Sequence, residues 1–235
     1  MKKPICFFTF ASDLYTPLAM KMVNSFKKFH SDIPMFYYGQ GEIDKALEDG
    51  FQMGRLAPYF GSKLSKDYEI VVSIESDNIV CDKMLEILEG DYEVAMGLNN
   101  YEGLLGYELP EVSRTKYLNT GIVASKSERF WELWKKLNLT HADRYRFVEQ
   151  DVVNNMLEFN DFNVKILDKD RVFYSSSIRK VWEQMEVRND KIYCADRLVR
   201  VIHWAGGNNN KFNWHERKFN PKVCARLDYL TNDAK

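Results

Sequence analysis

This chain of 235 residues has few of the residues that mark fibrous or disordered proteins. It contains only 6 prolines and 12 glycines, while 45% of its residues are apolar and 29% are charged. That composition is typical of a soluble globular protein and shows no sign of repeats or disorder. The length favours one large α/β domain over two independent ones, and we expect residues 1–235 to form it,.

Cysteine is also scarce. The 4 cysteines are scattered without C-x-x-C spacing, which argues against a zinc site, and they provide no disulfide framework,. We therefore expect a reduced, cytoplasmic setting.

An excess of charge of one sign and a long apolar run are both missing. The 33 basic residues nearly balance the 34 acidic ones, so we expect no general attraction for nucleic acid or anionic lipid. No window approaches the roughly 20 apolar residues of a transmembrane segment. The short apolar run at 5–11 is predicted to be a first core strand rather than part of a signal peptide,.

Strand and helix patterns alternate along the chain. Residues 99–116 lack periodicity and are typical of a binding loop or lid. We predict an α/β fold with a central mixed, mostly parallel sheet flanked by helices, and ligands where its strands end. The predicted strands are 5–10, 33–38, 69–74, 92–97, 117–124, 164–167 and 199–204, and the predicted helices are 16–29, short pieces within 43–65, 128–137, 147–159 and the end of a C-terminal tail at 216–235,.

One predicted strand ends in two carboxylates. In VVSIESDNIV, residues 71–80, Glu75 and Asp77 follow a β-branched, apolar run. Residues at i and i+2 of a strand point the same way. Two converging oxygen ligands suit a hard divalent cation, which in turn suits a diphosphate. Acidic residues are also common in polar loops after strands, so the pair alone leaves both interpretations open.

Three further segments stand out. The Asn-Thr-Gly segment at 119–121 interrupts a strand, where small residues would admit a ligand or simply form a β-bulge,. The acidic segment at 149–151 opens a helix, where acids ordinarily serve the helix dipole. His203 ends an apolar strand and precedes a glycine-containing loop with a lysine, which together could cradle a diphosphate,.

Together, in this order and at these separations, the four segments resemble the GT-A glycosyltransferases. The likeness is to the retaining family that includes glycogenin and bacterial lipopolysaccharide galactosyl- and glucosyltransferases, and it spans about residues 4–215. It implies transfer of a sugar from a nucleoside diphosphate sugar, by this likeness a UDP-sugar, to a glycan or other hydroxyl acceptor. It also implies retention of anomeric configuration and a need for Mn²⁺ or Mg²⁺.

The resemblance implies roles for individual residues. ESDNIV is similar to the D-x-D metal motif, and the segment from 203 to 211 to the late H-x-x-G-x-x-K motif, which implies metal binding by Glu75, Asp77 and His203. The segment similar to D-Q-D-x-x-N faces the anomeric carbon and sugar hydroxyls in that family, which implies a catalytic set of Glu149, Gln150 and Asp151, followed by Asn154. Donor binding is implied for Thr9, Phe10, Ala11, Tyr15, Lys63, Ser76, Asn119, Thr120, Gly121, Gly206 and Lys211.

The sequence departs from the family pattern in three places. Glutamate replaces aspartate at 75 and at 149, the loop from 206 to 211 is two residues longer, and Phe212 stands where a proline is usual. One alternative is therefore a degenerate domain that binds nucleotide or glycan without turnover. Another is an inverting enzyme with Glu149 or Asp151 as the base. A sugar nucleotidyltransferase is disfavoured because TFASDLYTP has neither a glycine nor a basic residue.

Overall fold

The computed structural model describes residues 1–53, 55–99, 117–141, 148–167, 172–173, 182–204, 212, 214–216 and 219–232. Its main feature is a six-stranded sheet in the order β2-β1-β3-β6-β5-β7. Five strands run in one direction and β6 runs against them, so the predicted mixed, mostly parallel sheet is confirmed. The strands are β1 (Lys3–Phe10), β2 (Met35–Tyr38), β3 (Tyr68–Ile74), β5 (Val94–Leu98), β6 (Leu118–Ser125) and β7 (Val164–Ile166).

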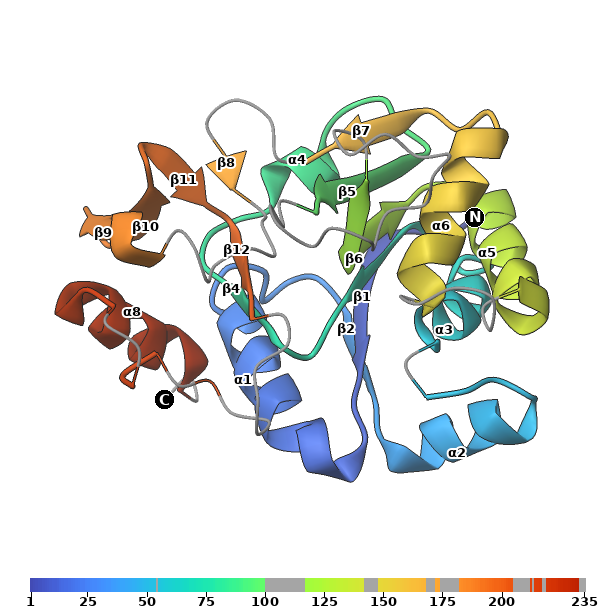
Figure 1. Ribbon diagram of the computed structural model, residues 1–235, viewed down its shortest axis with the longest axis horizontal. Helices are drawn as coiled ribbons and strands as arrows, with labels where there is room; N and C mark the ends of the chain where they lie inside the picture. The colour runs from blue at the N-terminus through green and yellow to red at the C-terminus, as the bar shows by residue number, and fades with distance from the viewer. Residues whose placement is uncertain are drawn as a thin grey trace.

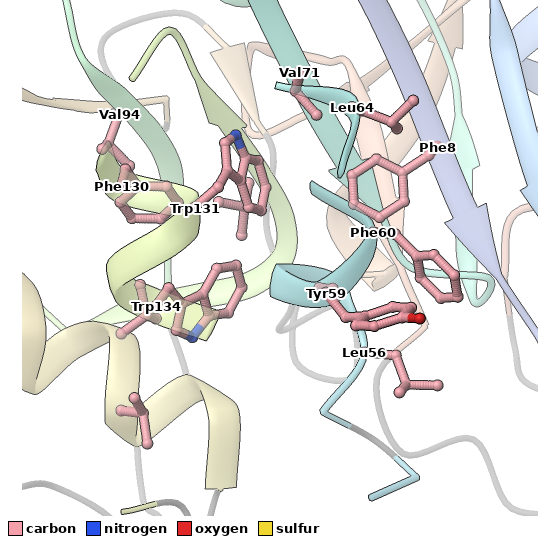
Figure 2. Packing of buried hydrophobic residues seen from close by; sticks show 14 of the residues in the cluster. Phe8, Leu56, Tyr59, Phe60, Leu64, Val71, Val94, Phe130, Trp131 and Trp134 are labelled. Carbon is pink, nitrogen blue, oxygen red and sulfur yellow. The ribbon is translucent and has the colours of Figure 1, made fainter. Parts of the chain in front are cut away.

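One face of the sheet packs against α3 (Ala57–Leu64), α5 (Glu128–His141) and α6 (Val148–Phe159) (Figure 1). Gly61 lets α3 and α5 approach closely, because a Cβ there would lie 2.2 Å from the ring of Trp131. Figure 2 shows Phe8 of β1 on this side, in a cluster with Tyr59, Phe60, Phe130, Trp131 and Trp134. α2 (Gln40–Glu48) follows β2 at the edge of the sheet.

The opposite face packs against α1 (Thr16–Lys27). Because side chains alternate along a strand, Phe7 of β1 points to this side while Phe8 points to the other,. Phe7 packs on Phe26 of α1, with their ring centroids 4.7 Å apart. α1 has a proline in its first turn, where the fixed φ of proline suits the start of a helix,.

A short strand pair leads out of this face into a second, smaller layer. β4 (Asn78–Val80) pairs antiparallel with β12 (Val201–His203). The prediction of one strand over 199–204 was wrong, because the chain changes sheets at Arg200, where β11 ends and β12 begins. The smaller sheet has the order β8-β11-β10-β9 and is formed by β8 (Val172–Phe173), β9 (Met185–Arg188), β10 (Lys191–Cys194) and β11 (Arg197–Val199).

The C-terminal segment ends in α8 (Pro221–Thr231), which lies beside α1 (Figure 1). A helix in this tail was predicted. The remaining short elements are α4 (Leu85–Leu88), η1 (Asp13–Tyr15) and η4 (Trp182–Gln184). None of the helices in the described part of the chain has the length and apolar character needed to cross a membrane. Residues 100–116, most of the predicted binding loop, lie outside the described residues.

Candidate metal and nucleotide site

The turn after β3 carries the predicted acidic pair. β6 runs antiparallel to β3 and extends past its carboxyl end, so the N–H of Glu75 donates to the carbonyl of Gly121 at 2.9 Å. The Nδ2 of Asn78 donates to the carbonyls of Glu75 and Gly121, each at 3.0 Å. These three hydrogen bonds to backbone carbonyls fix the turn that holds Glu75 and Asp77 against β6.

β12 brings His203 to the same turn. The register of the β4–β12 pair places His203 opposite Asn78, and the N–H of Trp204 donates to the carbonyl of Asp77 at 2.9 Å. The Nε2 of His203 then lies 3.0 Å from Oε2 of Glu75 and 3.2 Å from Oδ1 of Asp77. One ligand atom from each of the three side chains falls within 4.8 Å of the others. The fold thus brings the predicted metal ligands together.

The chemistry of these three side chains fits a divalent cation. Burial lowers the pKa of His203, but the carboxylates of Asp77 and Glu75 outweigh burial and raise the pKa to about 10. The Oδ1 of Asp77 is buried and makes no well-formed hydrogen bond. A bound cation would take the place of the Nε2 proton and satisfy both carboxylates. Carboxylates suit Mn²⁺ and Mg²⁺, and an imidazole nitrogen is a common further ligand.

Gly121 leaves the space in which the imidazole of His203 lies. A Cβ at this position would lie 2.4 Å from Nδ1 of His203 and 2.7 Å from Oδ1 of Asn119. Pairing with β5 is also irregular here, because Met96 pairs with Val123 whereas Gly97 pairs with Asn119. The irregular pairing therefore supports the explanation as a β-bulge, and the small residue admits a side chain of the site itself. The approach of a ligand at this segment stays a prediction.

A pocket of about 440 Å³ opens beside this acidic turn. Four of the residues predicted to bind the donor line it, namely Phe10, Ala11, Tyr15 and Ser76, whereas Thr9 is completely buried in β1. No pattern in the sequence singled out Ser12, Ile43 or Met53. The full lining is Phe10, Ala11, Ser12, Tyr15, Ile43, Met53, Glu75, Ser76, Asp77 and Glu149.

Glu149 contributes an unusual carboxyl group to the pocket wall. It is 8% exposed, and its Oε2 has no hydrogen-bond partner. Burial and the nearby charge of Glu75 raise its pKa well above the ordinary value, although Arg55 opposes the shift. Val148 before it has a φ of 44°, in a region that β-branched residues rarely adopt and that costs about 1–3 kcal/mol. Such strain is typical of functional sites.

The other two members of the predicted catalytic segment contact β6 and do not line the pocket. The Oε1 of Gln150 accepts hydrogen bonds from Nδ2 of Asn119 at 3.0 Å and from the N–H of Thr120 at 3.3 Å. Asp151 is 3% exposed and accepts a hydrogen bond from the hydroxyl of Tyr117. The three consecutive residues therefore have three different environments.

Of the remaining predicted donor contacts, those among the described residues do not line the pocket. Lys63 lies on α3, with its ammonium group 3.8 Å from the ring centroid of Tyr59. The cation whose charge acts on Glu149 is instead Arg55, which no sequence pattern indicated. Gly206 and Lys211 lie outside the described residues.

Comparison with solved structures identifies the fold. The chain is similar to the galactosyltransferase LgtC, solved in complex with donor and acceptor sugar analogs, with a TM-score of 0.59 and 14% identity over 97% of each chain. It is also similar to a glycosyltransferase involved in glycosylation of the major capsid of PBCV-1, with a TM-score of 0.55 and 10% identity over 97% of this chain and 100% of that one. The bifunctional glycosyltransferase WbbM matches with a TM-score of 0.53 and 12% identity, over 89% of this chain and 47% of that chain.

At these identities the likeness establishes the fold alone. The fold is that of the GT-A glycosyltransferases, as the sequence predicted. At the level of sequence, no family model and no curated protein matches the chain.

Proposed function

We propose that this GT-A-fold chain is a glycosyltransferase that moves a sugar from a UDP-sugar to a hydroxyl group of a glycan or other acceptor. Glu75, Asp77 and His203 would hold the Mn²⁺ or Mg²⁺ that the reaction needs. The observation that carries the proposal is the convergence of these three side chains, two of which, Glu75 and Asp77, line a pocket of about 440 Å³. The sugar analogs in the LgtC complex support a sugar donor and acceptor.

The pocket lining combines the two kinds of side chain that such a donor needs. Phe10, Ala11 and Tyr15 are apolar or aromatic, which suits a nucleobase. Glu75 and Asp77 are acidic, so a diphosphate could be held beside them only together with a cation. When bound, the divalent cation would stabilise the negative charge that builds on the leaving diphosphate as the anomeric bond breaks.

Glu149 is the carboxyl group that we place against the sugar. Its raised pKa favours the protonated form, which can donate a hydrogen bond to a sugar hydroxyl. That form is a poor base and a poor nucleophile. Gln150 is held by residues of β6, and Asp151 by Tyr117 just before that strand. We therefore favour retention by same-face attack of the acceptor over a covalent carboxylate intermediate and over an inverting mechanism.

UDP release in the presence of Mn²⁺ and a panel of UDP-sugars tests this function. We expect release to fall by about a hundredfold or more in Asp77→Ala, because an electrostatic stabiliser of the leaving group is lost, and to stop with EDTA. Asp161→Asn, an exposed acid beyond the end of α6, is the matched control and should behave as the parent. Release that ignores both EDTA and Asp77→Ala would contradict the proposal. Tight binding of UDP and Mn²⁺ with no turnover of any donor would instead favour a binding domain.

A further inference from the structure

A line of hydrogen bonds links α6 to the imidazole of His203 through β6. The Oε1 of Gln150 accepts from Nδ2 of Asn119 at 3.0 Å and from the N–H of Thr120 at 3.3 Å. The Oδ1 of Asn119 accepts from the N–H of Gly121 at 2.8 Å and lies 2.9 Å from Nδ1 of His203. The side chain of Asn119 thus links the amide of Gln150 directly to the ring of His203.

Two backbone N–H groups fix the direction of this line. A backbone N–H can only donate a hydrogen bond. The amide atom of Gln150 that faces the N–H of Thr120 must therefore be its oxygen, and the amide atom of Asn119 that faces the N–H of Gly121 must also be its oxygen,. The atom that faces Nδ1 of His203 is therefore an acceptor, and Nδ1 must carry a hydrogen. The other ring nitrogen, Nε2, is then the one that can exchange its proton for a cation held by the two carboxylates,.

We propose that Gln150 is a positioning residue, which holds the amide of Asn119 so that Nδ1 of His203 keeps its hydrogen and Nε2 faces the cation. This inference rests on the proposed function. It gives Gln150 a role other than the contact with the anomeric carbon that the resemblance implies. The structure supports it because Nε2 of Gln150 also donates to the hydroxyl of Tyr117 at 3.2 Å, so both ends of its amide are engaged outside the pocket.

Two substitutions of Gln150 separate positioning from packing. Gln150→Leu removes the acceptor for Asn119, whereas Gln150→Glu keeps one. Loss of an outer partner of a metal-binding histidine typically weakens metal affinity by about 10- to 100-fold. We therefore expect Mn²⁺ to bind Gln150→Leu at least about tenfold more weakly than the parent, and Gln150→Glu to bind like the parent. Free Mn²⁺ measured by electron paramagnetic resonance gives these affinities.

A second readout follows the hydrogen itself in the metal-free protein. In protein labelled with ¹⁵N-histidine, the Nδ1–H of His203 should give a cross-peak protected from solvent exchange, assigned by its loss in His203→Asn. Gln150→Leu should broaden or remove that cross-peak, and Gln150→Glu should keep it. Adding Asn119→Asp to Gln150→Leu should restore both the cross-peak and the Mn²⁺ affinity, because either carboxylate oxygen can accept from Nδ1–H.

The matched control is Asn154→Leu, one turn further along α6. Asn154 bonds to the backbone of Leu118 at 2.7 and 2.8 Å and donates to the carbonyl of Gln150 at 2.8 Å. It therefore holds α6 to β6 through backbone atoms and takes no part in the side-chain bond between Gln150 and Asn119. The variant Asn154→Leu should lower the free energy of unfolding and leave the His203 cross-peak unchanged. The proposal is overturned if Gln150→Leu retains the parent's affinity and cross-peak, or if Asn154→Leu loses them equally. A parent that binds no Mn²⁺ would refute the proposed function, while the cross-peak would still decide the role of Gln150.

Discussion

Each end of the β4–β12 strand pair carries two carboxylates, and the two ends are neutralised differently. Beyond Val80, the closed cluster consists of Asp82, Glu86, Lys191 and Arg200. The guanidinium group of Arg200 lies 3.3 Å from Asp82 and 2.8 Å from Glu86, and Lys191 lies 2.8 Å from Asp82. Before Asn78, the open cluster consists of Glu75, Asp77 and His203. Its basic group among the described residues is an imidazole.

The difference separates a structural cluster from a functional one. In the closed cluster the charges of two acids and two permanent cations balance, so the cluster needs no ligand to be stable. In the open cluster two acids face one ring, so within the described part of the chain at least one negative charge of this cluster is left unbalanced next to a pocket. Such an arrangement is costly in a folded chain unless a ligand completes it. The same short ladder therefore supports stability at one end and, we propose, cation binding at the other.

Breaking the closed cluster should have the largest effect on stability. Arg200→Met leaves Glu86 without its guanidinium partner and Asp82 with Lys191 alone, and removing one partner of a buried ion pair costs about 3–5 kcal/mol. We expect a loss of about 3 kcal/mol in urea unfolding with no change in Mn²⁺ affinity. Mn²⁺ at 100 times its Kd should add about 2.7 kcal/mol to the parent and to Arg200→Met, but nothing to Asp77→Asn.

Neutralising the acids should rescue the first variant. Asp82→Asn and Glu86→Gln, added to Arg200→Met, remove the two carboxylates that lose the guanidinium group and should recover most of the lost free energy of unfolding. If Arg200→Met instead weakened Mn²⁺ binding as strongly as Asp77→Asn does, the two ends would be coupled through the ladder, and the comparison would fail.

A smaller effect on stability is expected from Gly121→Ala, which acts on the open cluster. The new Cβ would lie 2.4 Å from the ring of His203, so the ring must move, at a cost of about 1–3 kcal/mol. The Mn²⁺ affinity should fall with it. Gly41→Ala is the control, because no atom lies within 4 Å of its added Cβ and a helical alanine is favoured over glycine by up to about 1 kcal/mol. Equal unfolding curves and equal Mn²⁺ affinities for the two variants would show that the glycine is not required by the imidazole.

The sequence predicts the open cluster better than the closed one. The β-branched run before Glu75 and Asp77 predicts where the strand ends and so locates both carboxylates at its exit. The strand alternation that was expected to align them does not apply, because both residues lie in the turn between β3 and β4. The position of His203 beside Glu75 and Asp77 depends on the pairing of β12 with β4, which no local pattern specifies. Only the family resemblance linked His203 to the two acids. Nothing indicated that Arg200 would separate two strands, because its charge is satisfied by acids more than a hundred positions away.

The fold shows the same division between local and distant information. Alternating strands and helices were predicted from periodicity, and the six-stranded sheet confirms them. The reversed direction of β6 was not predicted, since strand direction follows from connections and not from composition. That reversal contributes to the site, because the antiparallel β6 begins beyond the end of β3 and so places Asn119 and Gly121 beside Glu75.

The smallest effect expected concerns the second cation of the closed cluster. Lys191 and Arg200 both contact Asp82, but the Lys191 side chain is 48% exposed and that of Arg200 only 10%. Exposed ion pairs contribute about 0–1 kcal/mol and are screened by salt. Lys191→Met should therefore cost less than about 1 kcal/mol in urea unfolding, and less still at high ionic strength. A cost equal to that of Arg200→Met would mean that Asp82 needs both cations. The closed cluster would then be stabilised by its overall charge balance and not by the burial of one guanidinium group.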